Sequence, residues 1–322
     1  MIRSFVFSEG KLVAHDLEAE AMRLVRADKG LHLWVDLENP TEDEIRLVLE
    51  SVFQFHPLSV EDCVAPTSLP KIEDYEDYLF IVTHAVAYEH AEQFTTTELD
   101  FFLGKEFLVT FHRKPLLCIK WMAERCSKTP GVVARGTDRL AHDIIDQLLE
   151  RYTPVLDGLR HKIELIEARV LKEQADNLTE ELLDVRSELA ELRQIVRPQR
   201  DVINRLAHGD NKIVRTIMLP YFRDLRDNLL RQEETLTALG DALLVSFDLY
   251  LNKSASQANE GIKVLTALTA ISMPPILIGA WFGMNFTHMP ELDSPFGYWG
   301  ALSLMVGSTA AMFVWCRRRR WI

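Results

Sequence analysis

The chain has 322 residues, of which 48% are apolar and 26% are charged, and its formal net charge is −12. This acidic balance argues against nucleic acid as a partner and favours cations. The four cysteines show no CxxC spacing, which fits reduced cytosolic thiols better than a disulfide framework or a zinc site.

Residues 1–135 predict a cytoplasmic α/β domain. Short runs rich in valine, phenylalanine, threonine and isoleucine are typical of strands. They lie at 2–7, 11–14, 31–37, 78–87, 95–103 and 107–111. Thr41 and Glu44 have the spacing of a capping box, so we expect a helix over residues 41–55.

From residue 136 the pattern becomes wholly helical. Residues 136–215 carry leucine and isoleucine at spacings of three and four among dense charges, with a break near 175–177, and predict an antiparallel acidic helical hairpin. Residues 216–263 predict a stalk helix that continues without interruption into the next segment. A single helix from about 220 to 284 would be roughly 100 Å long, so it needs supporting neighbours, most simply copies of itself.

Two long apolar segments predict that the C-terminal part lies in a membrane. Residues 264–284 and 295–316 hold no Asp, Glu, Lys, Arg or His, and each is long enough to cross the hydrocarbon core. The four arginines in the tail, 317–322, indicate by the positive-inside rule that both termini are cytoplasmic and that 285–294 is an external loop. The alternative interpretation of the two runs is a pair of buried core helices. The N-terminus has too short an apolar stretch for a cleavable signal.

One face of the stalk helix and first span carries a stripe of residues that follow one another by three or four positions. We call these residues the stripe: Asp248, Leu251, Ala255, Asn259, Ile262, Leu265, Thr269, Met273, Ile276 and Ala280. The stripe predicts a seam between parallel helices, and in a bundle of about five helices the seam also lines a lumen. Its apolar members need no function beyond packing, whereas its polar members, such as Asn259 and Thr269, suggest water or ions.

The first span ends in Gly283-Met284-Asn285, and Met289-Pro290-Glu291-Leu292 follows in the loop before the second span and the basic tail. This arrangement resembles the CorA family of divalent metal-ion transporters. The resemblance extends upstream to residues 56–58, 61–62, 221–224 and 263–266. It implies a funnel-shaped homopentamer, built from an α/β cytoplasmic domain, a long helical stalk and two C-terminal transmembrane helices.

The resemblance also implies the site at the outer mouth of the pore. Gly283, Met284 and Asn285 would form the selectivity filter, where neutral amide and carbonyl oxygens can hold hydrated Mg²⁺ without trapping it. Glu291 and Asp293 in the external loop would raise the local concentration of cations.

Two further groups of residues follow from the resemblance. The pore would be lined by eight members of the stripe: Asp248, Asn259, Ile262, Leu265, Thr269, Met273, Ile276 and Ala280. Four acidic residues, Glu61, Asp62, Asp146 and Asp224, would form regulatory metal sites between subunits, because carboxylates held together repel one another unless a cation lies between them.

The implied function is influx of Mg²⁺, and of Co²⁺ or Ni²⁺, through the bacterial inner membrane, with closure of the pore by cytosolic Mg²⁺. Partners would be copies of the chain and the lipid bilayer. One alternative is a proton-coupled Zn²⁺ transporter of the ZntB branch, and another is a non-conducting regulatory or scaffold relative, which the apolar Ile276 in the pore would permit. An enzyme is not expected, because the sequence holds no GxxxxGK[ST], GxSxG or HExxH motif.

Overall fold

The computed structural model of the chain describes residues 1–9, 11–28, 30–65, 69–89, 93–128, 135–172, 178–284, 296–319 and 321. Within these residues the chain forms two compact units, residues 1–246 and residues 247–322. The first unit is a mixed α/β structure with additional helices, and the second is a pair of apolar helices, so the expected fold class is confirmed.

The described part of the first unit contains one seven-stranded sheet with the order β2-β1-β3-β7-β6-β5-β4. Its strands are β1 (Ile2–Ser8), β2 (Lys11–His15), β3 (His32–Glu38), β4 (Lys71–Asp74), β5 (Tyr78–Glu89), β6 (Gln93–Gly104) and β7 (Phe107–His112). All neighbours pair antiparallel except β3 and β7, which are parallel. All six predicted strands are confirmed. The edge strand β4 was missed because it is short and polar, with Ile72 its one buried residue.

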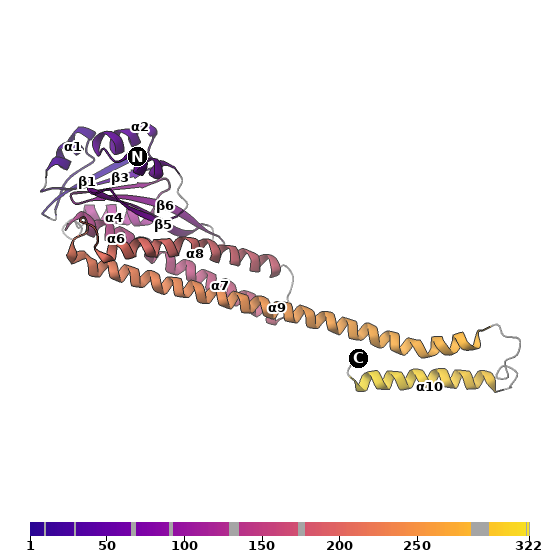
Figure 1. Ribbon diagram of the computed structural model, residues 1–322. Coiled ribbons are helices and arrows are strands. Elements are labelled where there is room, and N and C mark those ends of the chain that lie inside the picture. The colour runs from indigo at the N-terminus through magenta and orange to yellow at the C-terminus, as the bar shows by residue number, and fades with distance from the viewer. Residues whose placement is uncertain are drawn as a thin grey trace. The chain divides into compact units, whose positions relative to one another are not determined.

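Helices cover both faces of the sheet (Figure 1). One face carries α1 (Ala19–Ala27), α2 (Glu42–Ile45), the π-helical turn η1 (Arg46–Val52) and α3 (Pro57–Val64). Their apolar side chains form a core with the sheet, in which Phe55 stacks on Phe102 with ring centroids 4.2 Å apart. The other face carries α4 (Leu117–Lys128) and α6 (Thr137–Glu150).

The predicted helix over residues 41–55 is present but ends early. Its capping box is confirmed: the Glu44 amide donates to Thr41 Oγ1 at 3.3 Å, and the Thr41 amide donates to Glu44 Oε2 at 2.9 Å. After α2 the helix changes from α-helical to π-helical hydrogen bonding in η1. Gln54 then adopts a φ of 54°, in the left-handed region, which ends the helix. Phe53 and Phe55 are thereby both turned into the core.

Residues 136–215 contain three described helices where the sequence predicts two. The expected hairpin corresponds to α7 (Tyr152–Leu171) and α8 (Leu178–His208), whereas α6 is a separate, mostly buried helix. Ion pairs tie α7 to α8: Lys162 Nζ lies 2.7 Å from Glu188 Oε1, and Arg169 Nη1 lies 2.6 Å from Glu181 Oε1. The predicted break at 175–177 lies outside the described residues.

Helix α9 (Leu219–Phe282) begins after the 3₁₀ turn η2 (Thr216–Met218), and α10 (Gly297–Arg318) follows. The expected continuous helix from about residue 220 is confirmed. Both helices are long and apolar enough to cross a membrane, and only 6% of the most apolar window of each is buried. The alternative of two buried core helices is therefore wrong for this chain.

A buried charge network joins β1, β3 and β7 at the centre of the sheet. The Asp36 carboxylate is fully buried, and it accepts hydrogen bonds from Arg3 Nη2 at 2.8 Å and Thr110 Oγ1 at 2.7 Å. His112 Nε2 lies 3.2 Å from Asp36 Oδ1, while His112 Nδ1 lies 2.7 Å from the Lys114 carbonyl oxygen. With an acceptor at each ring nitrogen, the imidazolium form of His112 can donate a hydrogen bond at both positions.

This network shifts both pKa values in the stabilising direction. Burial alone would raise the pKa of Asp36, but the bonds and charges of His112, Thr110 and Arg3 lower it. Burial would lower the pKa of His112, but Asp36 raises it. The contribution of Asp36 is present above its ordinary value of 3.8, and that of His112 below 6.5, so their joint stabilisation is greatest between these two values.

We predict that Asp36→Ala lowers the thermal unfolding midpoint by roughly 6 to 20 °C at pH 6. Removing one partner of a buried ion pair costs about 3 to 5 kcal/mol, because the remaining charges lose their counter-ion. The measurement is thermal unfolding of the detergent-solubilised chain. Asp184→Ala, at an exposed position on α8, is the matched control and should shift the midpoint little. Equal effects of the two substitutions would contradict the role of the network.

Candidate functional site

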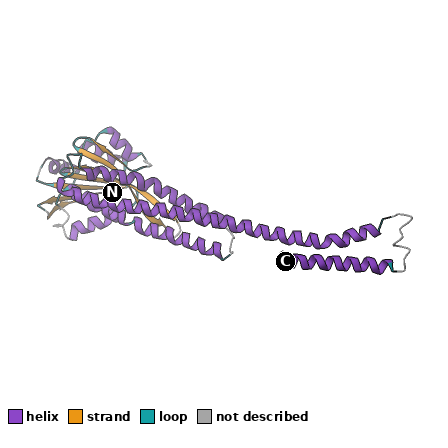
Figure 2. Cartoon of the chain, turned by 60° about the horizontal axis from the view of Figure 1, so that its bottom comes forward, coloured by secondary structure: helices purple, strands orange, loops and turns teal. Residues whose placement is uncertain are grey.

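The stripe lies on the uncovered side of α9 in the second unit. All ten of its residues are exposed, with exposed fractions of 60% for Ile262, 64% for Leu265 and 65% for Ile276. Helix α10 lies beside the end of α9 (Figures 1 and 2), and there Ala267 of α9 and Cys316 of α10 are completely buried. Because an α-helix advances about 100° per residue, Ala267 and the stripe fall on roughly opposite faces of α9.

The exposed face is apolar with polar interruptions, of which Asn259 and Thr269 lie closest to or within the first apolar span. The Thr269 hydroxyl donates to the Leu265 carbonyl oxygen at 2.9 Å, so its proton is used within the helix and its oxygen lone pairs remain as acceptors. Pro274 and Pro275 lie inside the helix, and each removes one amide donor, which frees a carbonyl oxygen one turn earlier. Such a face can offer oxygen atoms to a hydrated cation.

The end of α9 leads into the predicted filter. The Gly283 amide donates to the Gly279 carbonyl oxygen at 3.0 Å, and the Met284 amide donates to the Trp281 carbonyl oxygen at 3.4 Å. A Cβ atom at position 283 would lie 3.0 Å from the Gly279 carbonyl oxygen. Glycine therefore permits the close backbone approach at the C-terminal end of this helix. Asn285 lies outside the described residues, as do Glu291 and Asp293.

Two of the predicted regulatory residues come together within one chain. Asp146 is half-buried on α6, and Asp224 is exposed on α9. Burial raises the pKa of Asp146, and the charges of Glu150, Asp143 and Asp224 raise it further, while His142 opposes them. Asp146 therefore lies in a locally negative field to which Asp224 contributes, an arrangement that favours a cation.

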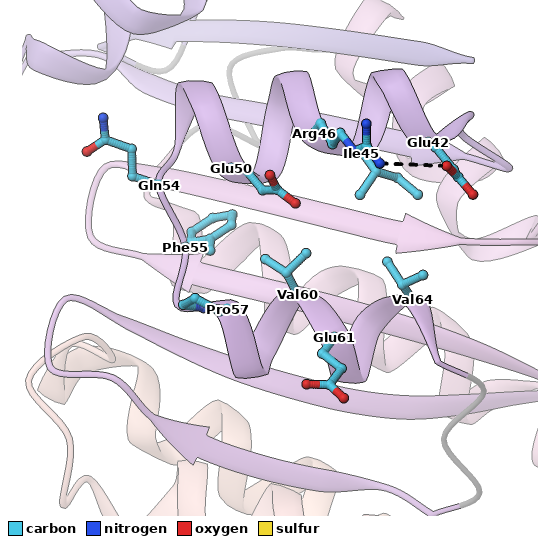
Figure 3. Close-up of a pocket in the computed structure, with 10 residues that line it drawn as sticks. All are labelled: Glu42, Ile45, Arg46, Glu50, Gln54, Phe55, Pro57, Val60, Glu61 and Val64. Atoms are coloured by element: carbon cyan, nitrogen blue, oxygen red, sulfur yellow. Dashed lines mark ion pairs between the residues drawn. The ribbon is translucent and has the colours of Figure 1, made fainter.

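Glu61 and Asp62, the other two predicted regulatory residues, lie on α3. Asp62 Oδ2 lies 2.5 Å from Lys71 Nζ, which also bonds Glu73 at 3.0 Å, so a protein cation already pairs this carboxylate. Glu61 is exposed at the edge of a cavity of about 700 Å³ between η1 and α3. Figure 3 shows Val60 and Val64 pointing toward η1 while the Glu61 carboxylate points away from it.

The structure also brings together a group that the sequence did not predict. Asp36, Glu38 and His112 are the one set among the described residues that offers three metal-type ligand atoms within 4.8 Å of one another. Arg3 bonds both carboxylates, at 2.8 Å to Asp36 and 3.2 Å to Glu38, so the negative charge is already balanced. We interpret this set as a structural ion cluster. Its only sequence signal was the alternation of two acids along one strand.

Comparison with known proteins identifies one family over almost the whole chain. The model of the family described as CorA-like Mg²⁺ transporter protein matches residues 30–318. YfjQ of Bacillus subtilis (strain 168) is 32% identical over 288 residues, which cover 89% of each chain. The cobalt/magnesium transport protein CorA of Thermotoga maritima is 27% identical over 297 residues, covering 92% of this chain and 85% of that protein.

The fold is also found among solved structures. The complete structure of the CorA magnesium transporter from Methanocaldococcus jannaschii superposes with a TM-score of 0.84, and the alignment covers 99% of this chain and 98% of that one. The sequence identity between the two chains is 22%, so this similarity shows the fold alone.

We predict that Asp146→Asn raises the thermal unfolding midpoint at pH 8 without divalent cations by roughly 1 to 4 °C. A carboxyl whose folded pKa is raised stabilises the fold while protonated, and this contribution is lost as the pH rises through the folded value. The neutral amide avoids that loss, so the gain should shrink at pH 5. Asp184→Asn serves as the exposed control, and a lowered midpoint for Asp146→Asn at pH 8 would contradict the predicted repulsion.

Proposed function

Because the chain belongs to the CorA family of divalent metal-ion transporters, we propose that it conducts Mg²⁺ into the cytosol through the inner membrane. It is a membrane protein with two C-terminal spans and not an enzyme. In the proposed membrane orientation both termini lie in the cytoplasm, with the arginines after α10 on the inner side. Co²⁺ and Ni²⁺ are proposed as further cargo.

The observation that carries this proposal is the uncovered stripe. Helix α10 covers the face of α9 that holds Ala267, and the stripe lies on roughly the opposite face, where all ten of its residues are exposed within the described part of the chain. Lipid could cover Leu265 and Ile276, which lie within the first span, but it offers no hydrogen-bond donor to the Thr269 oxygen between them. A parallel ring of five copies would pack the apolar members together and place the polar members around a water-filled axis.

The chemistry of the proposed pore suits a small hard cation. Mg²⁺ prefers octahedral oxygen ligands and gives up its water reluctantly, so neutral oxygens can hold the hydrated ion weakly enough for it to leave again. Asn285 in the proposed filter, and Asn259 with Thr269 along the stripe, offer such oxygens. An inside-negative potential supplies about 4.6 kcal/mol per 100 mV for a divalent ion, so influx needs no ATP.

Closure by cytosolic Mg²⁺ is proposed at the acidic residues of the first unit. The negative field at Asp146 and Asp224 fits a divalent cation, because such an ion would replace repulsion by attraction. At Asp62 the ion would compete with Lys71 for the carboxylate. We therefore expect Asp62 to bind the ion weakly in a single chain and more tightly in an assembly that brings further carboxylates to it. Loss of the ion would release the subunits and open the pore.

We predict Mg²⁺ influx into proteoliposomes under an inside-negative potential, and a fall of about tenfold or more in Asn285→Ala. A hydrogen-bonding group lost from a charged ligand costs about 1.5 to 3 kcal/mol, which corresponds to such a factor. Asn252→Ala, an exposed asparagine of α9 outside the stripe, is the matched control. Asp62→Ala/Asp224→Ala should retain influx and lose its inhibition by Mg²⁺ on the side of the first unit.

Three outcomes would overturn parts of this proposal. Transport of Zn²⁺ driven by a pH gradient, without Mg²⁺ flux, would identify a proton-coupled zinc transporter instead. Movement of neither ion would identify a non-conducting relative. Equal flux in Asn285→Ala and the Asn252→Ala control would remove the proposed filter while leaving the transporter.

We also predict that cysteine at a stripe position is crosslinked between copies in membranes. Leu265→Cys lies on the exposed stripe, whereas Ile278→Cys lies on the part-buried side of α9 that Ala267 shares. A short bis-maleimide should join Leu265→Cys chains into covalent dimers and larger oligomers on denaturing gels. Ile278→Cys should remain monomeric, and the native cysteines are all buried. The reverse pattern would place the stripe against lipid.

A further inference from the structure

A small cavity of about 150 Å³ lies where the C-terminal end of α3 meets β6 and the end of β7. Cys63 of α3, Glu98 and Asp100 of β6, and Arg113 after β7 are among its lining residues. Glu98 and Asp100 are two positions apart on one strand, so their side chains point to the same face of the sheet. None of these residues belongs to the proposed pore or to the four proposed regulatory residues.

Asp100 is the unusual member of this cavity. Its side chain is 1% exposed, no N–H or hydroxyl group among the described residues donates to either carboxylate oxygen, and its polar neighbours are the Cys63 thiol and Glu98. A buried carboxylate without a partner costs several kcal/mol, and native structures rarely leave one. Burial raises the pKa of Asp100 well above its ordinary range, and the nearby Glu98 charge raises it further.

Lys71 and Arg113, two protein cations near Asp100, are already engaged elsewhere. Lys71 acts on Asp100 only from a distance, because its ammonium group bonds Asp62 and Glu73. The Arg113 guanidinium donates to the Val64 carbonyl oxygen at 2.5 Å. The thiol of Cys63, which faces Asp100, is kept protonated by burial and is a weak, soft donor. Asp100 thus lines a cavity that Arg113 and Lys114 also line, and no protein cation donates a hydrogen bond to it among the described residues.

The size and chemistry of the cavity fit a hydrated hard cation. A water molecule occupies about 30 Å³, so 150 Å³ has room for an ion that keeps several waters. Mg²⁺ is typically held by one or two carboxylates together with such waters, and Mn²⁺ accepts the same oxygen ligands. Glu98 is only half-buried and gives the cavity an acidic entrance.

We propose that Asp100 and Glu98 together bind one divalent cation per chain, Mg²⁺ or a similar hard ion, in the cavity under the end of α3. The ion takes the place of the missing partners of Asp100 and removes the repulsion between the two carboxylates. Cys63 packs beside the ion without ligating it, because a hard cation prefers oxygen to a protonated thiol. The site is separate from transport, so it stands even if the chain conducts a different ion.

The experiment is Mn²⁺ binding to the detergent-solubilised full chain, counted by electron paramagnetic resonance of the free ion. The parent chain carries Asp62→Ala/Asp224→Ala, which removes two of the four proposed regulatory residues and so disables the proposed regulatory sites. We expect about one Mn²⁺ per chain, displaced by Mg²⁺, whereas an ion held in a shared pore would give a smaller, subunit-fractional number. Adding Asp100→Asn or Glu98→Gln should weaken this binding at least about tenfold, as loss of a charged ligand does.

Two matched variants serve as controls. Asp184→Asn removes an exposed carboxylate elsewhere, and Cys63→Ser keeps the cavity but replaces the thiol; both should retain the bound Mn²⁺. Glu98→Gln alters a half-exposed side chain, so it tests the site even if Asp100→Asn impairs folding. Undiminished Mn²⁺ binding in both Asp100→Asn and Glu98→Gln, or no Mn²⁺ bound by the parent chain, would overturn the proposal.

Discussion

The apolar surface that the second unit cannot cover by itself is the constraint on which the architecture depends. Within the second unit, α9 and α10 have one contact face each, where Ala267 and Cys316 are buried, and most of their remaining large side chains are exposed. In water such a pair would bury this surface by association, so it requires a bilayer. A bilayer alone leaves the Thr269 oxygen without water, and this second requirement leads from a membrane helix to an assembly with a hydrated interior.

Two buried carboxylates in the same sheet show how strongly partners decide the state of a charge. Asp36 and Asp100 are both almost completely buried, and burial by itself raises the pKa of each. The pKa of Asp36 is nevertheless lowered by its partners, whereas the pKa of Asp100 stays well above its ordinary range. Asp36 has Arg3, Thr110 and His112 around it, which stabilise the ionised form. Asp100 faces another acid instead, so the same fold holds one carboxylate as a structural anion and the other as a group that still lacks a partner.

Local patterns were sufficient to predict most elements of the fold. The strands have β-rich runs, the capping box of α2 lies within four residues, and the stripe repeats along one helix, so each signal is contained in a short segment. β4 was missed because Lys71–Asp74 has too little apolar character. The separation of α6 from α7 at Arg151 was missed although Pro154, in the first turn of α7, is a signal for a helix start. Two buried pairs could not be found from the sequence because only tertiary folding brings their members together: Asp36 with His112, which are 76 residues apart, and Cys63 with Asp100.

The regulatory and filter residues were predicted from family resemblance, since an acidic residue or an asparagine alone carries no such signal.

The parallel pairing of β3 with β7 has a consequence for how the sheet assembles. β1, β2 and β3 pair among themselves within the first 38 residues, and β4 to β7 pair as a second antiparallel set within residues 71–112. Each set is built from near neighbours, whereas the parallel join closes a loop of roughly 70 residues and is entropically the more demanding step. During synthesis the N-terminal set must therefore wait, with one edge of β3 open, until β7 has left the ribosome. The buried pair of Asp36 and His112 spans this join, so an ion pair stabilises the contact between the two sets of strands.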